Sequence, residues 1–271
     1  MSRFSLFSGR TLADIPTRLE YLEPYRPLSA YLLGTLELDE FLSLQRRLVY
    51  EVGGDRTTGS VILCEHPPGV TIGREGSRAH IRPNFEALEV RLRRSEGQSV
   101  SRAHPLVRWV SRGGGAMLHL PEQVACYPIL PLDLLGISAS RYVEELQNIG
   151  VELLRRFDLA GTIDRERPGV SVNGRRVVHI GVAIRERITC FGFVVNVNPD
   201  LELFHQVSCD GDPLPMTSIR RESPSRIRVS GVRQQLLDLI AARFGFDRVS
   251  VFHNHPSTLP RSLRHAAAPS S

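Results

Sequence analysis

The chain has 271 residues, and its 34 Lys plus Arg against 29 Asp plus Glu give a formal net charge of +5. All 34 of these cationic residues are arginine, because the sequence contains no lysine. Arginine keeps its proton under ordinary conditions, whereas lysine is the usual amine nucleophile and tunable base. The composition therefore excludes a GxxxxGK[ST] phosphate loop, Schiff-base catalysis by a lysine of this chain, and a lysine that holds an acyl-adenylate.

The remaining composition, 41% hydrophobic and 23% charged, is typical of a soluble globular protein. The four cysteines are far apart and form no CxxC pair, which predicts neither a zinc site nor a disulfide framework. The first residues lack the apolar core of a signal peptide, and no apolar run reaches about 18 residues. We therefore expect a cytoplasmic protein that needs no metal or other cofactor and binds neither membrane nor nucleic acid.

Three segments have apolar residues at helical spacing. The first is Leu38 to Val52, the second begins near Ser138 or Ser140, and the third follows Ser230 as a candidate N-cap and ends before Gly245. Six runs between them are typical of β-strands, and they are 60–64, 106–111, 125–130, 169–172, 176–184 and 188–197.

The sequence Asn173-Gly174 joins two of these runs and predicts a two-residue hairpin turn. If the strand after it alternates regularly, Arg176, Val178 and Ile180 share one face and His179 points to the other. These elements together predict an α+β fold, with a mixed or antiparallel central sheet flanked by helices.

One catalytic domain is expected over residues 31–250, with an N-terminal extension at 1–30 and a disordered tail at 251–271. His253 and His255 open that tail. No cluster of carboxylates or thiols accompanies them, so we expect solvated side chains rather than a metal site.

Three segments carry candidate chemistry. Consecutive glycines at 113–115 let backbone N–H groups approach a carbonyl or thioester oxygen, although a flexible turn is an equal alternative. The segment Glu65 to Arg74 contains Pro67-Pro68, and by itself it favours a structural connection. Cys209 lies in a polar, turn-rich loop, where we expect a more accessible thiol than the other three, which lie in apolar runs.

Taken in order, these segments resemble the octanoyltransferases of lipoate synthesis, in the superfamily of lipoate–protein and biotin–protein ligases. The family segments EHPP…TLG, RGGQVTYHGPGQLVxYPI, PGVW, KxAxIG, GLALNV and a cysteine followed by TSL are matched at 65–73, 112–129, 168–170, 176–181, 192–197 and 209–219. The resemblance covers about residues 35 to 245, and it implies the fold of a lipoate/biotin–protein ligase catalytic domain.

The resemblance also implies a reaction. A cysteine thiolate, here Cys209, attacks the octanoyl thioester of acyl carrier protein, and a lysine of a lipoyl domain then attacks the acyl-enzyme. The acceptors implied are lipoyl domains of 2-oxoacid dehydrogenases and the glycine cleavage H protein. The implied acyl-binding residues are Arg112, Gly113, Gly114, Gly115, Ala116, Met117, Leu118, His119, His179, Ile180, Gly181, Gly192, Phe193 and Val194.

The chain departs from the family pattern at the residue that assists the cysteine. The family lysine falls on Arg176, which can stabilise a thiolate by its charge but cannot accept a proton near neutrality. His119 is left as a candidate proton carrier, and the family histidine of FHGLA is Phe191 here. The alternative hypotheses are a catalytically impaired relative that binds carrier protein or lipoyl domain, and, last, an ATP-dependent ligase on the same scaffold.

Overall fold

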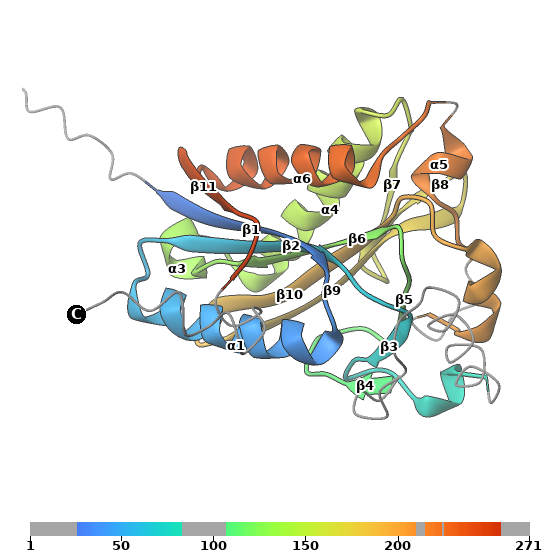
Figure 1. Cartoon of the computed structure of the whole chain (residues 1–271), viewed down its shortest axis with the longest axis horizontal. Helices are drawn as coiled ribbons and strands as arrows, with labels where there is room; N and C mark the ends of the chain where they lie inside the picture. Colours follow the sequence, from blue (N-terminus) through green and yellow to red (C-terminus); the bar gives the residue numbers. More distant parts are fainter. Residues whose placement is uncertain (1–25, 83–106, 210–214, 224, 256–271) are drawn as a thin grey trace, which may run out of the picture.

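The computed structural model describes residues 26–82, 107–209, 215–223 and 225–255. Its main element is an eight-stranded mixed sheet, drawn edge-on in Figure 1. In spatial order the strands are β11 (Arg248–Phe252), β1 (Pro27–Thr35), β2 (Gly59–Glu65), β6 (Gln123–Ile129), β10 (Ile188–Asn196), β9 (Arg175–Arg185), β8 (Gly169–Val172) and β7 (Thr162–Asp164). β1 pairs in parallel with β11 and β2, and the other neighbours are antiparallel.

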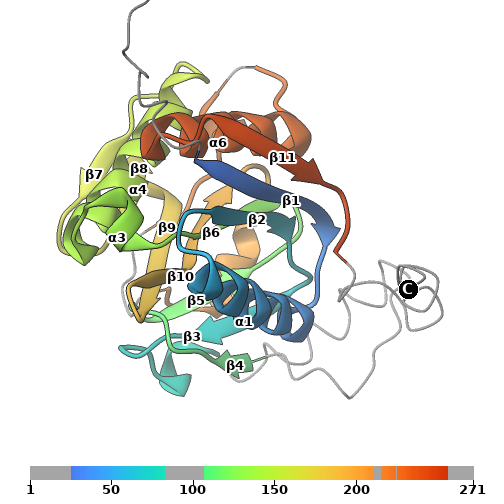
Figure 2. The ribbon, with the colours of Figure 1, turned by 90° about the vertical axis from the view of Figure 1, so that its left-hand side faces the viewer.

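Helices cover both faces of this sheet (Figures 1 and 2). α4 (Ala139–Arg155) and α6 (Val229–Phe244) lie on one face, above a large apolar core. α1 (Leu38–Gly54) lies on the opposite face, above a second apolar cluster. Two short helices, α3 (Leu132–Leu135) and α5 (Ile219–Glu222), connect strands to the longer helices.

A second, three-stranded sheet lies on the α1 side, below the main sheet in Figure 1. Its order is β4 (Val107–Trp109), β3 (Gly69–Ile72) and β5 (Ala116–His119), with β3 parallel to β4 and antiparallel to β5. Two 3-10 turns, Arg78–His80 and Leu201–Gln206, pack near it. The space between α1, the small sheet and the main sheet is where the candidate site forms.

The predicted α+β fold with a mixed central sheet is confirmed, as are the three long helices. Two details differ. α6 begins at Val229 with Arg228 at the cap position, so Ser230 lies inside the helix and is not its N-cap. Five strands, β1, β3, β5, β7 and β11, were not predicted. Four of them have only three to five residues, whereas β1 has nine and lies between β11 and β2.

The hairpin between β8 and β9 contains a feature that alternation alone does not anticipate. Asn173 and Gly174 have positive φ values of 51° and 72°, as the turn requires. Val170 pairs with Val178, but Ser171 pairs with Arg176, so β9 has one extra residue, a β-bulge at Val177. Val177 and Val178 therefore both enter the core under α4.

Beyond the bulge, Arg176 falls on the face that carries His179. Gly169 pairs with His179, and a Cβ on Gly169 would collide with the Arg176 guanidinium. The expected separation of Arg176 from His179 onto opposite faces is therefore wrong, because the bulge reverses the alternation.

At the far edge of the sheet, the ordered structure extends past both expected boundaries. β1 begins at Pro27 and β11 ends at Phe252. His253 is exposed, but His255 is buried and packs edge-on against Tyr31, so the expectation of solvated side chains is wrong for His255. The rest of the predicted extension and tail, residues 1–25 and 256–271, lies outside the described residues. No helix among the described residues is long and apolar enough to span a membrane.

Candidate active site

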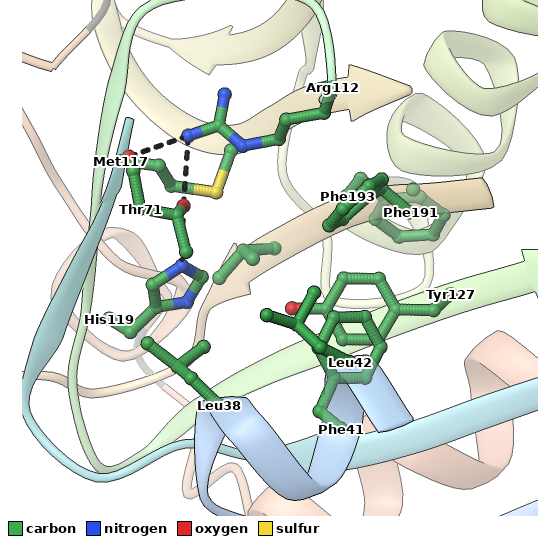
Figure 3. Close-up of a pocket in the computed structure, with 13 residues that line it drawn as sticks. Leu38, Phe41, Leu42, Thr71, Arg112, Met117, His119, Tyr127, Phe191 and Phe193 are labelled. Atoms are coloured by element: carbon green, nitrogen blue, oxygen red, sulfur yellow. Dashed lines mark hydrogen bonds between the residues drawn. The ribbon is translucent and has the colours of Figure 1, made fainter. Parts of the chain in front are cut away.

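A narrow apolar cavity lies between α1, β5 and the middle of the main sheet (Figure 3). Its walls come from Leu38, Phe41, Leu42, Met117, Tyr127, Phe191, Phe193 and Val194, with Gly181 and Gly192 in the sheet. The Phe41 and Tyr127 rings stack at 4.1 Å between centroids. Gly192 is required here, because a Cβ at this position would collide with the Cys126 carbonyl oxygen. Such a cavity suits an unbranched hydrocarbon chain.

One end of the cavity is polar. Arg112 is buried, and its Nη2 donates to both the carbonyl oxygen and Oγ1 of Thr71 at 2.9 Å, while Nη1 donates to the Gly113 carbonyl. His119 Nε2 lies 3.0 Å from the same Thr71 hydroxyl (Figure 3). Burial above all, and then electrostatic interactions with His66, Arg112 and His179, hold the pKa of His119 well below its ordinary value. His119 is therefore neutral at pH 7, and its lowered pKa makes it a weak base that releases a proton readily.

A second buried histidine supports this end of the cavity. His66 Nδ1 lies 2.6 Å from the Leu36 carbonyl and Nε2 lies 2.9 Å from the Tyr127 hydroxyl, with its ring edge-on to His119 at 5.1 Å. Burial lowers the pKa of His66 to about 4, against the raising effect of the bond to Leu36. The sequence analysis interpreted Glu65 to Arg74 as a structural connection and did not predict a role for His66. The position of this histidine, between an apolar strand and two prolines, was the available signal.

Backbone strain marks the opposite wall. Phe191 has φ of 58°, a left-handed conformation that is rare for a bulky side chain. Its N–H donates to Gln45 Oε1 of α1 at 2.6 Å. This contact holds the aromatic ring at the position where the resembled family has a histidine. Strained residues of this kind are retained where the surrounding structure requires them, and many lie at functional sites.

The glycine loop lies over β9 and borders a second cavity. The Gly113 N–H donates to the Val182 carbonyl at 2.8 Å, and a Cβ on Gly181 would lie 2.9 Å from Arg112 Cδ. The second cavity is lined by four charged residues, Arg74, Glu75, Glu166 and Arg167, together with the glycines and apolar residues such as Ile180. Gly181 lines both cavities, so they meet at this glycine.

Arg176 lies beneath the rim of the second cavity and is almost fully buried, at 1% exposed. Its Nη2 donates to Asp164 Oδ2 at 2.7 Å, and Nη1 donates to the carbonyls of Arg167 and Pro168 at 3.2 and 3.4 Å. Asp164 also accepts from the N–H groups of Glu166 and Arg167. The guanidinium is thus held rigidly, and the Asp164 carboxylate offsets part of its charge.

Cys209 is only 3% exposed, so the expectation that its loop position makes it accessible is wrong. Its backbone pairs with Ala116 of β5, and its side chain packs in an apolar cluster with Val70, Ile72 and Phe204. Burial of this kind opposes thiolate formation unless a cation compensates for it. The structure does not bring the Cys209 side chain into the wall of either cavity.

The segment that follows Cys209 is nevertheless fixed beside Arg176. The Arg176 N–H donates to the Pro215 carbonyl, and the Thr217 N–H donates to the Arg176 carbonyl, both at 2.9 Å. Glu222 anchors this contact by accepting hydrogen bonds from Thr217, Asn173 and Arg175. Burial opposes ionisation of Glu222, but these bonds outweigh it and lower its pKa. The backbones on either side of residues 210–214 therefore reach β5 and Arg176 respectively.

The remaining predicted site residues divide among four locations. Seven of them line the apolar cavity: Arg112, Met117, His119, Gly181, Gly192, Phe193 and Val194. Gly113, Gly114, Gly115 and Ile180 line the second cavity. Ala116 and Leu118 face the apolar cluster around Cys209. His179 lines neither cavity but is buried on the same face as its strand partner Val194.

This fold and site define a known class of protein. A family model described as the lipoyl protein ligase A/B catalytic domain matches residues 38–241. Octanoyltransferase LIP2, mitochondrial, from Arabidopsis thaliana is 29% identical over 86% of this chain and 95% of its own length. An octanoyltransferase from Caldicellulosiruptor bescii is 32% identical over 79% of this chain and 90% of its own length. The chain therefore belongs to the lipoyl protein ligase A/B catalytic domain family, in its octanoyltransferase branch, and is an enzyme of the acyltransferase class.

Solved structures agree on the fold. A lipoate-protein ligase A bound with ATP superposes with a TM-score of 0.61, at 14% identity, over 87% of this chain and 94% of that one. The P. falciparum LipL1 structure in complex with lipoate gives 0.60, at 12% identity, over 90% of this chain and 69% of that one. At these identities the likeness supports the architecture alone.

Proposed function

We propose that this chain transfers an octanoyl group from octanoyl-acyl carrier protein to a lysine of a lipoyl domain, through a thioester on Cys209. The observation that carries the proposal is the cavity of Figure 3, with an apolar body and one polar end at Arg112, Thr71 and His119. The apolar lining suits the acyl chain in its chemistry, and the thioester carbonyl suits the polar end.

The reaction is two successive acyl transfers. The Cys209 sulfur attacks the donor carbonyl, a new carbon–sulfur bond forms, and the bond to the carrier thiol breaks. The departing thiolate takes up a proton. The acceptor amine then attacks the Cys209 thioester, an amide forms, and the cysteine sulfur leaves. Neither transfer needs ATP, because the donor thioester is already activated.

The proposed charges follow from the contacts around the site. Arg112 stabilises negative charge on the carbonyl oxygen, and Arg176 favours the thiolate of Cys209 by its fixed positive charge. The proton cannot go to Arg176, which stays protonated at neutral pH. The candidate carrier is His119, whose lowered pKa favours passing the proton on to the departing thiolate. Because Cys209 is buried and Asp164 offsets Arg176, the segment around Cys209 has to move toward the cavity for this chemistry.

The direct test is mass spectrometry of the intact protein after incubation with octanoyl-acyl carrier protein. We expect one octanoyl group on Cys209, none on Cys209→Ser, and transfer to an added lipoyl domain. Cys126→Ser serves as the matched control, because Cys126 lies in the core beneath the helices and should not affect acylation. An unmodified wild type would overturn the proposal.

The competing hypothesis is a relative that binds carrier protein or lipoyl domain without transfer. The Arg176–Asp164 pair and the buried thiol favour it, since both oppose thiolate formation. Pull-down of either partner without an acyl adduct would support this alternative. Restoration of lipoylation in a cell without its own transferase would exclude it.

For the acceptor we propose the lipoyl domains of 2-oxoacid dehydrogenases and the glycine cleavage H protein, which offer a lysine on an acidic domain. A cytoplasmic location remains a prediction from the sequence. The Arabidopsis relative is named as mitochondrial. Fractionation of the native host would decide the compartment.

A further inference from the structure

A groove distinct from both cavities lies beside the segment that carries Cys209. Val207 and Ser208, which precede Cys209, line it together with Pro215 and Met216, which follow the loop. The groove encloses about 1180 Å³, including its open side, and shares no lining residue with the cavity of Figure 3. A molecule in this groove therefore contacts Val207 and Ser208, next to the proposed nucleophile in the chain, without occupying the acyl cavity.

Arginines give the groove its charge. Arg82, Arg175 and Arg221 line it. Arg175 is compensated by Glu222 at 2.8 Å, but Arg82 and Arg221 form no ion pair with any residue in the described part of the chain. The acidic residue in the lining is Glu202, which is 86% exposed at the rim. Two exposed guanidiniums in a concave surface are well suited to a phosphate group.

The groove also has apolar lining. Leu201, Phe204 and Met216 provide it, and we call these three side chains the apolar floor. This combination suits a long, uncharged, methyl-bearing amide chain that ends in a phosphodiester. It does not suit an acceptor lysine, because the arginines repel a cationic amine and leave the apolar floor without a partner.

We propose that this arginine groove binds the phosphodiester-linked amide arm on which an acyl carrier presents its thioester. The proposal rests on the proposed function, since it assigns the path of that reaction's donor. Arg82 and Arg221 contact the phosphodiester, and the apolar floor contacts the arm. The acyl chain enters the cavity of Figure 3, and the acceptor approaches by another route.

The test compares acylation of Cys209 by three donors: octanoyl-acyl carrier protein, octanoyl-phosphopantetheine and octanoyl-pantetheine, which lacks the phosphate. Arg82→Gln and Arg221→Gln should each raise KM for both phosphorylated donors about fivefold, and the double variant about 20-fold, because each removes one exposed charge-assisted contact. KM for octanoyl-pantetheine and kcat for all donors should not change. Glu202→Gln should lower KM for the phosphorylated donors.

Arg46→Gln is the matched control. Arg46 is exposed on α1, where its side chain donates to Ser43, so this variant should behave as wild type with every donor. An equal rise in KM with and without phosphate, or no rise at all, would overturn the proposal. A rise with carrier protein but not with octanoyl-phosphopantetheine would also overturn it, because the groove would then contact an acidic protein surface.

Binding of unacylated, phosphopantetheine-bearing carrier protein, followed by fluorescence anisotropy, separates this proposal from the proposed function. If wild type acylates with no donor but Arg82→Gln and Arg221→Gln still weaken binding about fivefold, the transferase fails and the groove stands. If wild type acylates normally and both variants bind as tightly as wild type, the groove fails and the transferase stands.

Discussion

The two faces of the eight-stranded sheet differ in what they bury. The face under α4 and α6 is apolar, with Leu146, Leu153 and Val178 in continuous contact. The face toward α1 and the small sheet buries Arg112, His119 and other polar groups inside an apolar surround. Burying a charge or an imidazole lowers stability unless it is well bonded. The first face therefore stabilises the fold. The second face lowers the stability, because it buries the polar groups of the candidate active site.

The difference between the two faces is tested most directly by substituting one residue on each face. Arg112→Gln removes the cation and its bonds to Thr71 and Gly113, so we expect the second-order rate of acyl transfer to fall about 100-fold. Leu153→Ala leaves a hole under α4, so we expect the free energy of unfolding to fall by about 2–5 kcal/mol. Denaturant titration and single-turnover acylation of both variants provide the measurements.

Leu153→Ala should leave the rate per folded molecule unchanged, since Leu153 faces away from both cavities. If the rate falls in proportion to stability in both variants, the division of labour between the faces is wrong.

A smaller effect is expected from pH. The folded chain holds His66 at a pKa of about 4, below the ordinary 6.5, so the unfolded chain binds a proton first as pH falls. The free energy of unfolding should therefore have its full value above about pH 6.5. It should decrease as the pH falls toward 4, by an amount on the order of 3 kcal/mol. His66→Gln should flatten this part of the profile in urea titrations at stepped pH.

His253→Gln, at an exposed position, is the control and should keep the wild-type slope. A wild-type profile that is flat between pH 6.5 and 4 would show that the buried histidines on the α1 face do not cost stability in acid.

The smallest expected effect is that no octanoyl amide forms on a side chain of this protein. Because the chain has no lysine, a reactive thioester on Cys209 meets no side-chain amine of its own protein. We expect hydroxylamine to remove all side-chain-bound octanoyl groups, since it cleaves thioesters and not amides. Peptide mapping after prolonged incubation with donor checks this, and a hydroxylamine-resistant side-chain adduct would contradict it. Introducing a lysine at exposed Arg220 should create such an adduct if the Cys209 thioester reaches that surface.

Much of the fold was predictable because local rules decide it. The helix at Leu38 follows from apolar spacing, and the turn at Asn173-Gly174 follows from the conformations these two residues tolerate. The short strands β3 and β5 were not predictable, since they are stable only when paired with each other beside the main sheet. The strand β11 was likewise not predictable, because its partner β1 lies at the other end of the described chain.

The site residues likewise divide into those that local sequence identified and those that depend on distant contacts. Gly113 and His119 were identified from their segments and line the cavities, whereas His66 was missed because its role depends on Leu36 and Tyr127, which lie far away in sequence. The face of Arg176 was predicted wrongly, because a single extra residue at Val177 reverses the alternation of β9.

The sequence by itself determined the chemical limits of this protein. The absence of lysine rules out proton transfer by an amine at position 176, whatever the fold, because arginine does not release its proton near neutrality. Only the tertiary structure decided how the remaining groups are used. It buried Cys209, paired Arg176 with Asp164, and gathered His66 and His119 at one cavity, since pKa and reactivity depend on burial and neighbours that the order of residues does not specify.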